Sequence, residues 1–444
     1  MQDLLLRLFK DFDQADIQYC LLRGYEELDD IDDRSDIDIL VQVDQVDRLR
    51  EILERLEFVS LSSWGRAPHH FFVGYNQSDD RWLKLDIVTT IAYGNPIHAI
   101  YTDLAARCLQ RRIKRGLVFV ASPEDELLTL LLHCVLDKAM FASNRRQRIA
   151  TLKHDIEDEK YLTTLLQRYW APGMTWQRLA AMIDAAGWDE LLSQRSAVAA
   201  WLARRQKLRV RSRQIYGLVL RKLDRVAGLF QPRSLTVALL APDGGGKTTL
   251  ATELARTFYL PSRYIYMGSH SDVDATRLPT TRWIQARSNQ ARSSRNLPIW
   301  LVVRGLRFAN NLVEQWYRYG MSYYHRMRGR LVLFDRYAYD VNAHGYSKLS
   351  VKSRTRRWLL SAVAPKPDLI VFLDAPGEML YARKGEHSPE VLEAQRQHYL
   401  GLQKRLPQMI VVDATHDADY VRRTVTSLIW RRYADLFQRG FARG

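Results

Sequence analysis

A glycine-rich segment at residues 243–249, with the sequence DGGGKTT, has the residue types that bind phosphate. Backbone N–H groups at a strand-to-helix turn converge on an anion, while a lysine reaches the outer phosphates and a threonine hydroxyl binds Mg²⁺. Lys247 and Thr248 occupy the last two positions of the phosphate-loop pattern, but Ala241 stands where the pattern has its first glycine. We interpret this segment as a nucleotide site. The alternative is a glycine turn with an incidental lysine.

Two further groups of polar residues follow apolar runs. Asp335 and Arg336 come directly after residues 331–334, so they are expected at the carboxyl edge of a sheet, where α/β proteins bind ligands. There, the carboxylate can hold Mg²⁺ or orient the attacking group, and the guanidinium can bind a phosphoryl oxygen. Arg383 and Lys384 lie on a predicted helix and could close over the phosphate. The alternatives are a turn cap for the first pair and a solvated helix face for the second.

Three carboxylates near the start of the chain form another candidate site. Asp36 and Asp38 are two residues apart on a predicted strand, so both project from one face, and Asp86 lies on another predicted strand. Carboxylates on neighbouring strands can hold two Mg²⁺ ions that activate an attacking oxygen and stabilise a leaving pyrophosphate. The alternatives are acidic loop residues, or a fold that has lost catalysis.

The elements that position the phosphate loop are short apolar runs alternating with helical patterns. Such alternation predicts βαβ units around a buried, five-stranded parallel sheet. The runs are residues 235–241, 263–268, 330–336, 369–375 and 409–414.

The segments around the carboxylates alternate between helix and strand patterns. Helix periodicity is found in residues 4–15 and 43–56, and strand patterns in residues 18–24, 36–43, 69–75 and 81–90. Residues from about 122 to 230 have helical patterns, and Ser122 followed by Pro123 is a typical helix start. We therefore expect three domains, at residues 1–110, 111–233 and 234–444.

Composition limits the class of protein. The 444 residues are 47% hydrophobic, which is enough for globular cores, and the three cysteines are scattered. This spacing excludes a disulfide scaffold or a zinc site and indicates a reducing compartment. Because there is no signal-peptide pattern and no apolar run near the ~20 residues of a membrane span, a cytoplasmic location is expected.

Charge is distributed unevenly. Residues 1–100 hold 10 Lys/Arg and 20 Asp/Glu, whereas residues 101–444 hold 56 Lys/Arg and 30 Asp/Glu. Opposite signs in two parts of one chain indicate separate domains and an anionic partner for the second. Residues 201–228 contain nine basic residues and one Asp. This segment is interpreted as a solvated helix or linker, with a surface for nucleic acid or anionic lipid as the alternative.

The carboxyl-terminal motifs together resemble the thymidylate kinase family of P-loop nucleoside-monophosphate kinases. The likeness rests on DGGGKTT, DRY about 88 residues later, PDLIVFLDAP, ARKGE and QRQHYLGL, and covers about residues 234–444. The resemblance implies a three-layer α/β domain that uses ATP and Mg²⁺. It assigns ATP to the loop, through Asp243, Gly244, Gly245, Gly246, Lys247, Thr248 and Thr249, with Mg²⁺ at Thr248. Asp413 and Thr415, in the turn after the last strand, would lie near the adenine. It assigns the acceptor phosphate and catalysis to Asp335 and Arg336, metal binding to Asp335 as well, and the lid to Arg383; Lys247 and Arg383 also count among the catalytic residues.

Two segments depart from that family. Residues 267–283 replace its Glu-Pro-Gly segment, and residues 342–347 (NAHGYS) replace its Ala-Tyr-Gln stretch. Since those segments hold the thymidine nucleotide in the family, phosphoryl transfer is expected with thymidylate as a poor acceptor.

The amino-terminal carboxylates resemble those of the minimal nucleotidyltransferase superfamily. The likeness consists of Gly24 after the first strand, the Asp36-x-Asp38 pair, the later Asp86 and a helical segment, within residues 1–200; Tyr25 stands where the superfamily usually has Ser. It implies an α+β domain with a helical extension.

The leading prediction is an α/β multidomain enzyme in which a nucleotidyltransferase-like domain is joined to an ATP-dependent kinase-like domain. Its partners would be a nucleotide and a phosphorylatable small molecule. One alternative is a regulatory or nucleic-acid-processing NTPase with a non-catalytic amino-terminal binding domain, in which the basic helices bind the nucleic acid. Another is a membrane-surface scaffold that uses Trp283, Trp300 and Trp316. The acceptor and the oligomeric state are left open.

Overall fold

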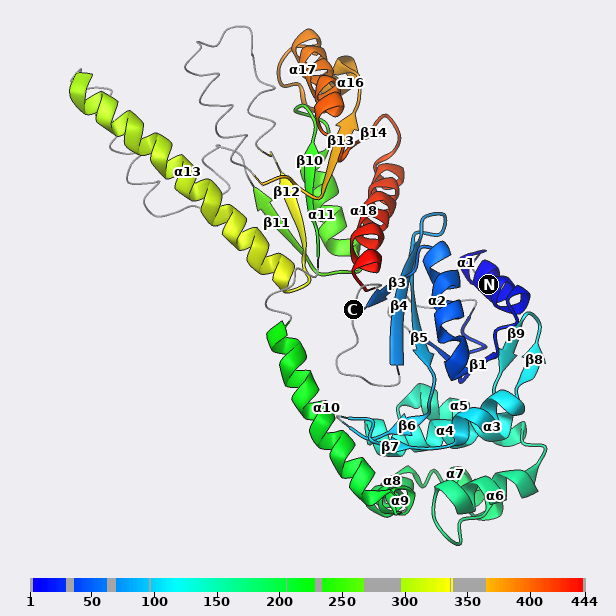
Figure 1. Cartoon of the computed structure of the whole chain (residues 1–444). Coiled ribbons are helices and arrows are strands. Elements are labelled where there is room, and N and C mark those ends of the chain that lie inside the picture. The colour runs from blue at the N-terminus through cyan, green and yellow to red at the C-terminus, as the bar shows by residue number, and fades with distance from the viewer. Residues whose placement is uncertain are drawn as a thin grey trace. The chain divides into compact units, whose positions relative to one another are not determined.

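The computed structural model divides the chain into two compact units, Met1–Val226 and Ala227–Gly444. Each unit has its own sheet and helices (Figure 1). The structure describes residues 3–28, 36–61, 69–95, 97–204, 206–227, 234–266, 297–335, 337 and 365–441.

The first unit contains a mixed seven-stranded sheet in the order β3-β4-β5-β2-β1-β9-β8. Its strands are β1 (Tyr19–Leu21), β2 (Asp36–Val41), β3 (Val59–Leu61), β4 (His69–Asn76), β5 (Arg81–Val88), β8 (Ile113–Arg115) and β9 (Val118–Val120). A separate pair consists of β6 (Ala92–Tyr93) and β7 (Ile100–Tyr101). Within the large sheet, β2 runs parallel to β5 and antiparallel to β1.

Two amphipathic helices, α1 (Asp3–Gln14) and α2 (Val46–Arg55), cover one face of this sheet; a short 3₁₀ turn, η1 (Val43–Gln45), precedes α2. Phe9 and Leu53 pack there against Ile37 and Ile39 of β2. Because side chains alternate along a strand, burial of Ile37 and Ile39 on this face directs Asp36 and Asp38 to the other.

Helices cover the second face and share a core with the sheet, through Cys20, Leu22 and Leu40. Ser122 caps α4 by accepting a hydrogen bond from the Asp125 backbone N–H at 3.3 Å, and Pro123 is the first helical residue, as predicted. The helices are α3 (Leu104–Gln110), α4 (Pro123–Leu132), the π-helical η2 (His133–Lys138), α5 (Ser143–His154), α6 (Glu159–Tyr169), α7 (Trp176–Asp184), α8 (Trp188–Ser193) and α9 (Arg195–Ala203). The long α10 (Lys207–Ala227) follows.

The second unit is built on a five-stranded sheet in which every pairing is parallel, with the order β11-β12-β10-β13-β14. The strands are β10 (Thr236–Leu240), β11 (Ser262–Tyr266), β12 (Leu331–Asp335), β13 (Leu369–Asp374) and β14 (Met409–Asp413). The five-stranded parallel sheet predicted from the apolar runs is thus confirmed. The strand that precedes the glycine loop, β10, lies at its centre.

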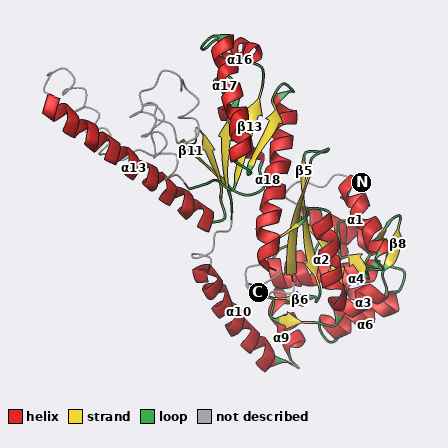
Figure 2. Cartoon of the chain, turned by 45° about the horizontal axis from the view of Figure 1, so that its top comes forward, coloured by secondary structure: helices red, strands yellow, loops and turns green. Residues whose placement is uncertain are grey.

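Helices lie on both faces of this sheet, which makes three layers (Figure 2). On one face, Tyr319 of α13 (Leu297–Met327) and Tyr399 of α17 (Pro389–Leu402) join Phe334 and Phe372 in a buried cluster. On the other, α11 (Lys247–Thr257) contacts α18 (Ala418–Phe441). The short α16 (Gly377–Lys384) packs against α17, and η4 (Gln403–Arg405) follows α17. No helix within the described ranges is both long and apolar enough to cross a membrane.

Candidate functional site

The glycine loop joins the central strand β10 to α11. Gly246 caps the helix with φ +79°, and Gly244 has φ +85°. These left-handed conformations favour glycine, because a Cβ atom would be strained there. Lys247 and Thr248 begin the helix that follows, so the backbone N–H groups of its first turn face the loop.

The alanine at the first position of the motif fits the loop's packing. A Cβ atom on Gly245 would lie 2.5 Å from the Cβ atom of Ala241, so residue 245 must be glycine if residue 241 carries a methyl group. Ala241 is itself buried. The altered motif therefore keeps the loop's strand-to-helix geometry.

The Lys247 ammonium lies within the loop. This side chain is 9% exposed, and its Nζ atom donates to the carbonyl oxygens of Ala241 at 2.5 Å and Pro242 at 3.0 Å. A phosphate oxygen in the loop can replace these neutral acceptors with an anionic one, which gives a stronger charge-assisted hydrogen bond.

Asp335 lies at the end of β12, beside the loop. The strand register pairs it with Leu239 of β10, and the residue is only 3% exposed. Its Oδ2 atom accepts from the Tyr264 hydroxyl at 2.6 Å and from the Thr248 hydroxyl at 3.5 Å. Its Oδ1 atom is buried without a hydrogen-bond partner among the described residues. A buried carboxylate oxygen beside a threonine hydroxyl fits the oxygen ligands that Mg²⁺ requires.

Tyr264, on β11, is a site residue that sequence reasoning missed. Burial and the adjacent Asp335 carboxylate raise the pKa of its hydroxyl, so it stays protonated and donates to that carboxylate. The sequence signal is weak, because a tyrosine in an apolar strand is common and its partner is fixed only by strand register.

The helix α16 packs closely against the loop. A Cβ atom on Gly244 would lie 2.5 Å from the carbonyl oxygen of Leu380, which places the α16 backbone directly over that glycine. Arg383, near the end of α16, donates to the carbonyl oxygen of Ala414 at 3.0 Å. The structure thus brings the predicted lid residue to the turn after β14.

That turn contains the residues predicted to lie near adenine. The Asp413 carboxylate accepts from the Thr415 hydroxyl at 2.6 Å and from its backbone N–H at 2.8 Å, and these bonds lower the pKa of Asp413. In the glycine loop, Asp243 Oδ2 lies 3.5 Å from His387 Nε2. Thr249 is exposed in the first turn of α11, and Arg336 lies outside the described residues.

The amino-terminal carboxylates come together as their spacing predicts. The parallel register of β2 and β5 pairs Asp38 with Asp86 and Asp36 with Lys84. Each acid faces a basic group of the same unit. Arg23 Nε lies 2.5 Å from Asp38 Oδ2, Lys84 Nζ lies 2.7 Å from Asp36 Oδ1, and His69 Nδ1 lies 2.9 Å from both oxygens of Asp86.

His69 also contacts a second histidine: its Nε2 atom lies 3.1 Å from Nδ1 of His98. Burial raises the pKa of Asp86, although the hydrogen bond from His69 opposes the rise. Burial would lower the pKa of His69, but the bond to Asp86 and the charge of that carboxylate outweigh it and raise the pKa. Neither histidine belongs to the sequence pattern that predicts the carboxylate site.

Across the part of the chain that the structure describes, no group of three or more His, Cys, Asp or Glu residues is arranged to hold a metal ion. The pairing of each amino-terminal acid with a basic side chain is consistent with this. A metal role for Asp36, Asp38 and Asp86 stays a prediction.

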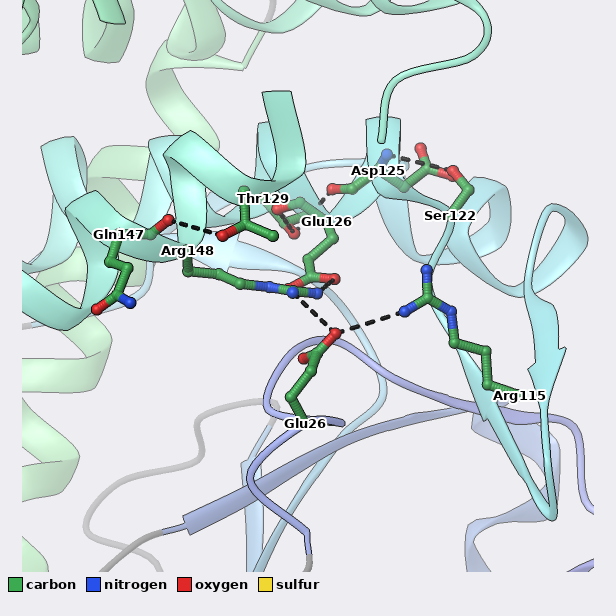
Figure 3. Close-up of polar contacts among 9 residues, drawn as sticks. Glu26, Arg115, Ser122, Asp125, Glu126, Thr129, Gln147 and Arg148 are labelled. Carbon is green, nitrogen blue, oxygen red and sulfur yellow. Dashed lines mark hydrogen bonds and ion pairs between the residues drawn. The ribbon is translucent and has the colours of Figure 1, made fainter. Parts of the chain in front are cut away.

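A charge network holds the loop that follows β1 (Figure 3). Glu26 lies two residues after Gly24 and accepts from Arg148 at 2.8 Å and from Arg115 at 3.4 Å. Arg148 also forms two 2.7 Å bonds to the buried Glu126 of α4. Burial raises the pKa of Glu126, and the Arg148 bonds oppose that rise. Arg148 of the helical layer therefore anchors the described loop around Glu26, directly after β1.

Comparison with known proteins finds similarity to thymidylate kinases. The chain is 28% identical over 214 residues to the thymidylate kinase of Xanthomonas oryzae pv. oryzae strain PXO99A, which is 46% of this chain and 87% of that protein. It is 29% identical over 220 residues to that of Xanthomonas campestris pv. campestris strain B100, or 47% and 88% of the two chains. The matched length is consistent with one P-loop domain of this type.

A solved structure of thymidylate kinase from Candida albicans aligns with 45% of this chain and 94% of its own, at 20% identity and a TM-score of 0.34. No protein-family model matches the chain.

Proposed function

We propose that the unit Ala227–Gly444 transfers the γ-phosphoryl group of ATP to a phosphate or hydroxyl acceptor on a nucleotide or another small molecule. The observation that carries this proposal is the placement of Lys247, Thr248 and the buried Asp335 around one glycine loop at the carboxyl end of a parallel sheet. The similarity to thymidylate kinases supports a nucleotide kinase at this coarse level.

In this mechanism the loop and the first turn of α11 hold the phosphates by their backbone N–H groups, and Lys247 binds the outer phosphate oxygens. Thr248 and Asp335 would hold Mg²⁺, which neutralises charge on the transferring group when it is bound. Asp335 also orients the attacking oxygen of the acceptor. Tyr264 keeps the Asp335 carboxylate in place by its 2.6 Å hydrogen bond.

The lid function is assigned to α16. Arg383 would move from the carbonyl oxygen of Ala414 towards the transferring phosphate, because an anion is a stronger acceptor than a neutral carbonyl. We assign Arg336 to the acceptor phosphate on its sequence position alone.

The direct test uses the full chain with ATP labelled in its γ-phosphate, Mg²⁺ and a metabolite extract, followed by identification of the labelled product. Lys247→Ala should abolish labelling, because the loop loses its charge against the outer phosphates. The matched control is Lys404→Ala, which removes an exposed lysine of the same unit. Equal labelling by parent and Lys247→Ala proteins would refute the proposal.

The acceptor is proposed to differ from thymidylate. This rests on residues 267–283 and 342–347, which lie outside the described residues and depart in sequence from the segments that hold thymidylate. A site built to hydrogen-bond one acceptor loses that acceptor when the partner groups are missing. Efficient phosphorylation of thymidine monophosphate would contradict this part of the proposal and leave the phosphoryl-transfer step intact.

A second function, nucleotidyl transfer, is proposed for the unit Met1–Val226. The register that pairs Asp38 with Asp86, two residues from Asp36, favours it. The two reactions would act in series on one substrate, with phosphorylation followed by nucleotidyl transfer. The competing proposal is a regulatory NTPase whose amino-terminal unit only binds a ligand. It predicts ATP hydrolysis without transfer to any small molecule.

A further inference from the structure

The helix α10 has an exposed apolar face. Its exposed large apolar side chains are Leu208, Ile215, Tyr216, Leu218, Val219 and Leu223, of which Leu208 is 85% exposed. Leu208, Ile215, Val219 and Leu223 are separated by seven, four and four residues. Because residues at such spacings lie above one another on a helix, these four form one continuous stripe.

The opposite face of α10 is packed against the first unit. Val210 is buried in a cluster with Ala99 and Ile100. The Arg213 guanidinium donates to the Ala99 carbonyl oxygen at 3.3 Å and lies 3.9 Å from the centre of the Tyr101 ring. At Gly217, a Cβ atom would come within 2.9 Å of Ile97. These contacts fix the rotation of the helix, so the apolar stripe points away from its own unit.

Basic side chains border the stripe. Arg211 lies four residues before Ile215, and Lys222 lies three residues after Val219, so each is a neighbour of the stripe on the helix surface. Lys207 and Arg209 are also exposed. Asp224 is the single acidic residue in the sequence of α10. The helix therefore combines an aliphatic stripe with a positive rim.

We propose that α10 is a docking surface for an anionic lipid membrane, on which it lies parallel to the bilayer plane. Helices that bind in this way insert an apolar face to the level of the acyl-chain boundary while Lys and Arg contact anionic headgroups. This inference is independent of the proposed phosphoryl transfer.

The aliphatic stripe favours lipid over nucleic acid as the partner. Binding to nucleic acid depends on phosphate contacts from Lys and Arg and on aromatic stacking with bases, and neither uses exposed Leu, Ile and Val. A bilayer instead provides an apolar phase for those side chains and phosphate groups for the rim. A membrane therefore accounts for both the aliphatic stripe and the basic residues that border it.

The test measures co-sedimentation of the full chain with vesicles. One set contains equal parts of phosphatidylcholine and phosphatidylglycerol, and the other contains phosphatidylcholine only. We expect binding to the anionic vesicles that weakens with added salt. The variant Ile215→Gln/Val219→Gln/Leu223→Gln should bind at least about a hundred-fold more weakly, since it loses three apolar insertions but keeps good helix formers. Arg211→Gln/Lys222→Gln should bind roughly thirty-fold more weakly, from the electrostatic contribution of two basic residues.

Matched controls are available on other helices. Val391→Gln removes an exposed apolar side chain from α17, and Arg178→Gln removes an exposed arginine from α7. Both should bind like the parent, and thermal unfolding should confirm that every variant is folded. Three results would overturn the proposal. They are no binding to anionic vesicles, undiminished binding by the apolar variant, and an effect of the α10 substitutions confined to oligonucleotide binding or to self-association.

Discussion

The two carboxylate oxygens of Asp335 have different surroundings. Oδ2 accepts the Tyr264 hydroxyl, whereas Oδ1 is buried without a partner among the described residues. Burying an acceptor without a hydrogen bond costs ~1–3 kcal/mol, so such an atom commonly belongs to a ligand site. We propose that the first oxygen fixes the side chain through Tyr264 and that the second receives a cation or an attacking hydroxyl.

Asp335→Asn should lower the turnover of phosphoryl transfer by ~10² or more, which is the scale of losing a positioned acid–base group. The amide keeps the shape of the carboxylate and one acceptor oxygen, so the melting temperature should change little. Steady-state kinetics and thermal unfolding check the two expectations. Retained turnover with a collapsed melting temperature would show that Asp335 only caps a turn.

Tyr264→Phe removes the hydroxyl that fixes Asp335. We expect turnover to fall by ~10-fold, because a catalytic carboxylate with more freedom spends less time in the reactive geometry. We also expect a loss of stability on the order of 1 kcal/mol from the missing hydrogen bond. The control is Tyr323→Phe, which changes an exposed tyrosine of α13 and should affect neither quantity.

Residues of the loop could be predicted from the sequence because their spacing along the chain determines their geometry. Gly246, Lys247 and Thr248 are consecutive, and Asp335 ends an apolar run. Tyr264 and Asp335, by contrast, are 71 residues apart, and His69 and His98 are 29 apart. Their contacts arise from strand register and loop path, which a single sequence does not encode locally.

At the scale of elements, long apolar runs predicted strands well and short ones were missed. All five strands of the second unit were expected, whereas β8 and β9 have three residues each and β6 and β7 have two. Segments of that length are too short to show period-two alternation. The π-helical turn η2, inside a continuous apolar helix pattern, was also not expected.

The histidine that begins η2 predicts a pH response of the first unit. Burial lowers the pKa of His133 from 6.5, although its 2.9 Å contact with Asp137 opposes the shift. A histidine with a lowered folded pKa contributes stability above its unfolded pKa and loses it as the pH falls through the folded pKa. We therefore expect stability to decrease as the pH falls below about 6.5, and His133→Gln to reduce this decrease.

Thermal unfolding of the full chain at a series of pH values provides the measurement. His154→Gln is the control, because His154 is an exposed residue of the neighbouring helix α5. An unchanged pH profile in His133→Gln would show that other groups dominate acid unfolding.

At the scale of the whole molecule, the chain separates into two units that differ in fold. Helices after residue 111 share a core with the strands of the first unit, so the structure has one compact unit where the sequence patterns suggested a sheet domain and a helical domain. Periodicity shows where helices occur but not which core they join. The proposed boundary near residue 110 stays a prediction about folding units.

The predicted nucleotide binding by the first unit can be tested apart from binding by the second. In a Lys247→Ala background, Mg²⁺ with an NTP should stabilise the full chain if Asp36, Asp38 and Asp86 share metals. A ligand that binds only the folded state adds about 2.7 kcal/mol at a hundred-fold excess over Kd. Asp36→Asn/Asp38→Asn should abolish this stabilisation as measured by thermal shift.

The control for that experiment is Asp44→Asn/Asp47→Asn, which removes two exposed acids near α2. It should retain the thermal shift. Loss of the shift in both variants would indicate a general charge effect, and its absence from the parent would favour an amino-terminal unit that binds no metal-nucleotide complex.

The central position of β10 has a consequence for synthesis on the ribosome. This strand pairs with β12 on one side and β13 on the other, and its first residue bonds to Asp368, 132 residues further along the chain. At a translation rate of ~5–20 residues per second, β10 leaves the ribosome roughly ten seconds before β13 is available. During that interval a strand of five buried residues has an open edge. Chaperone binding to the nascent second unit is expected in this window, while the first unit, already synthesised, folds.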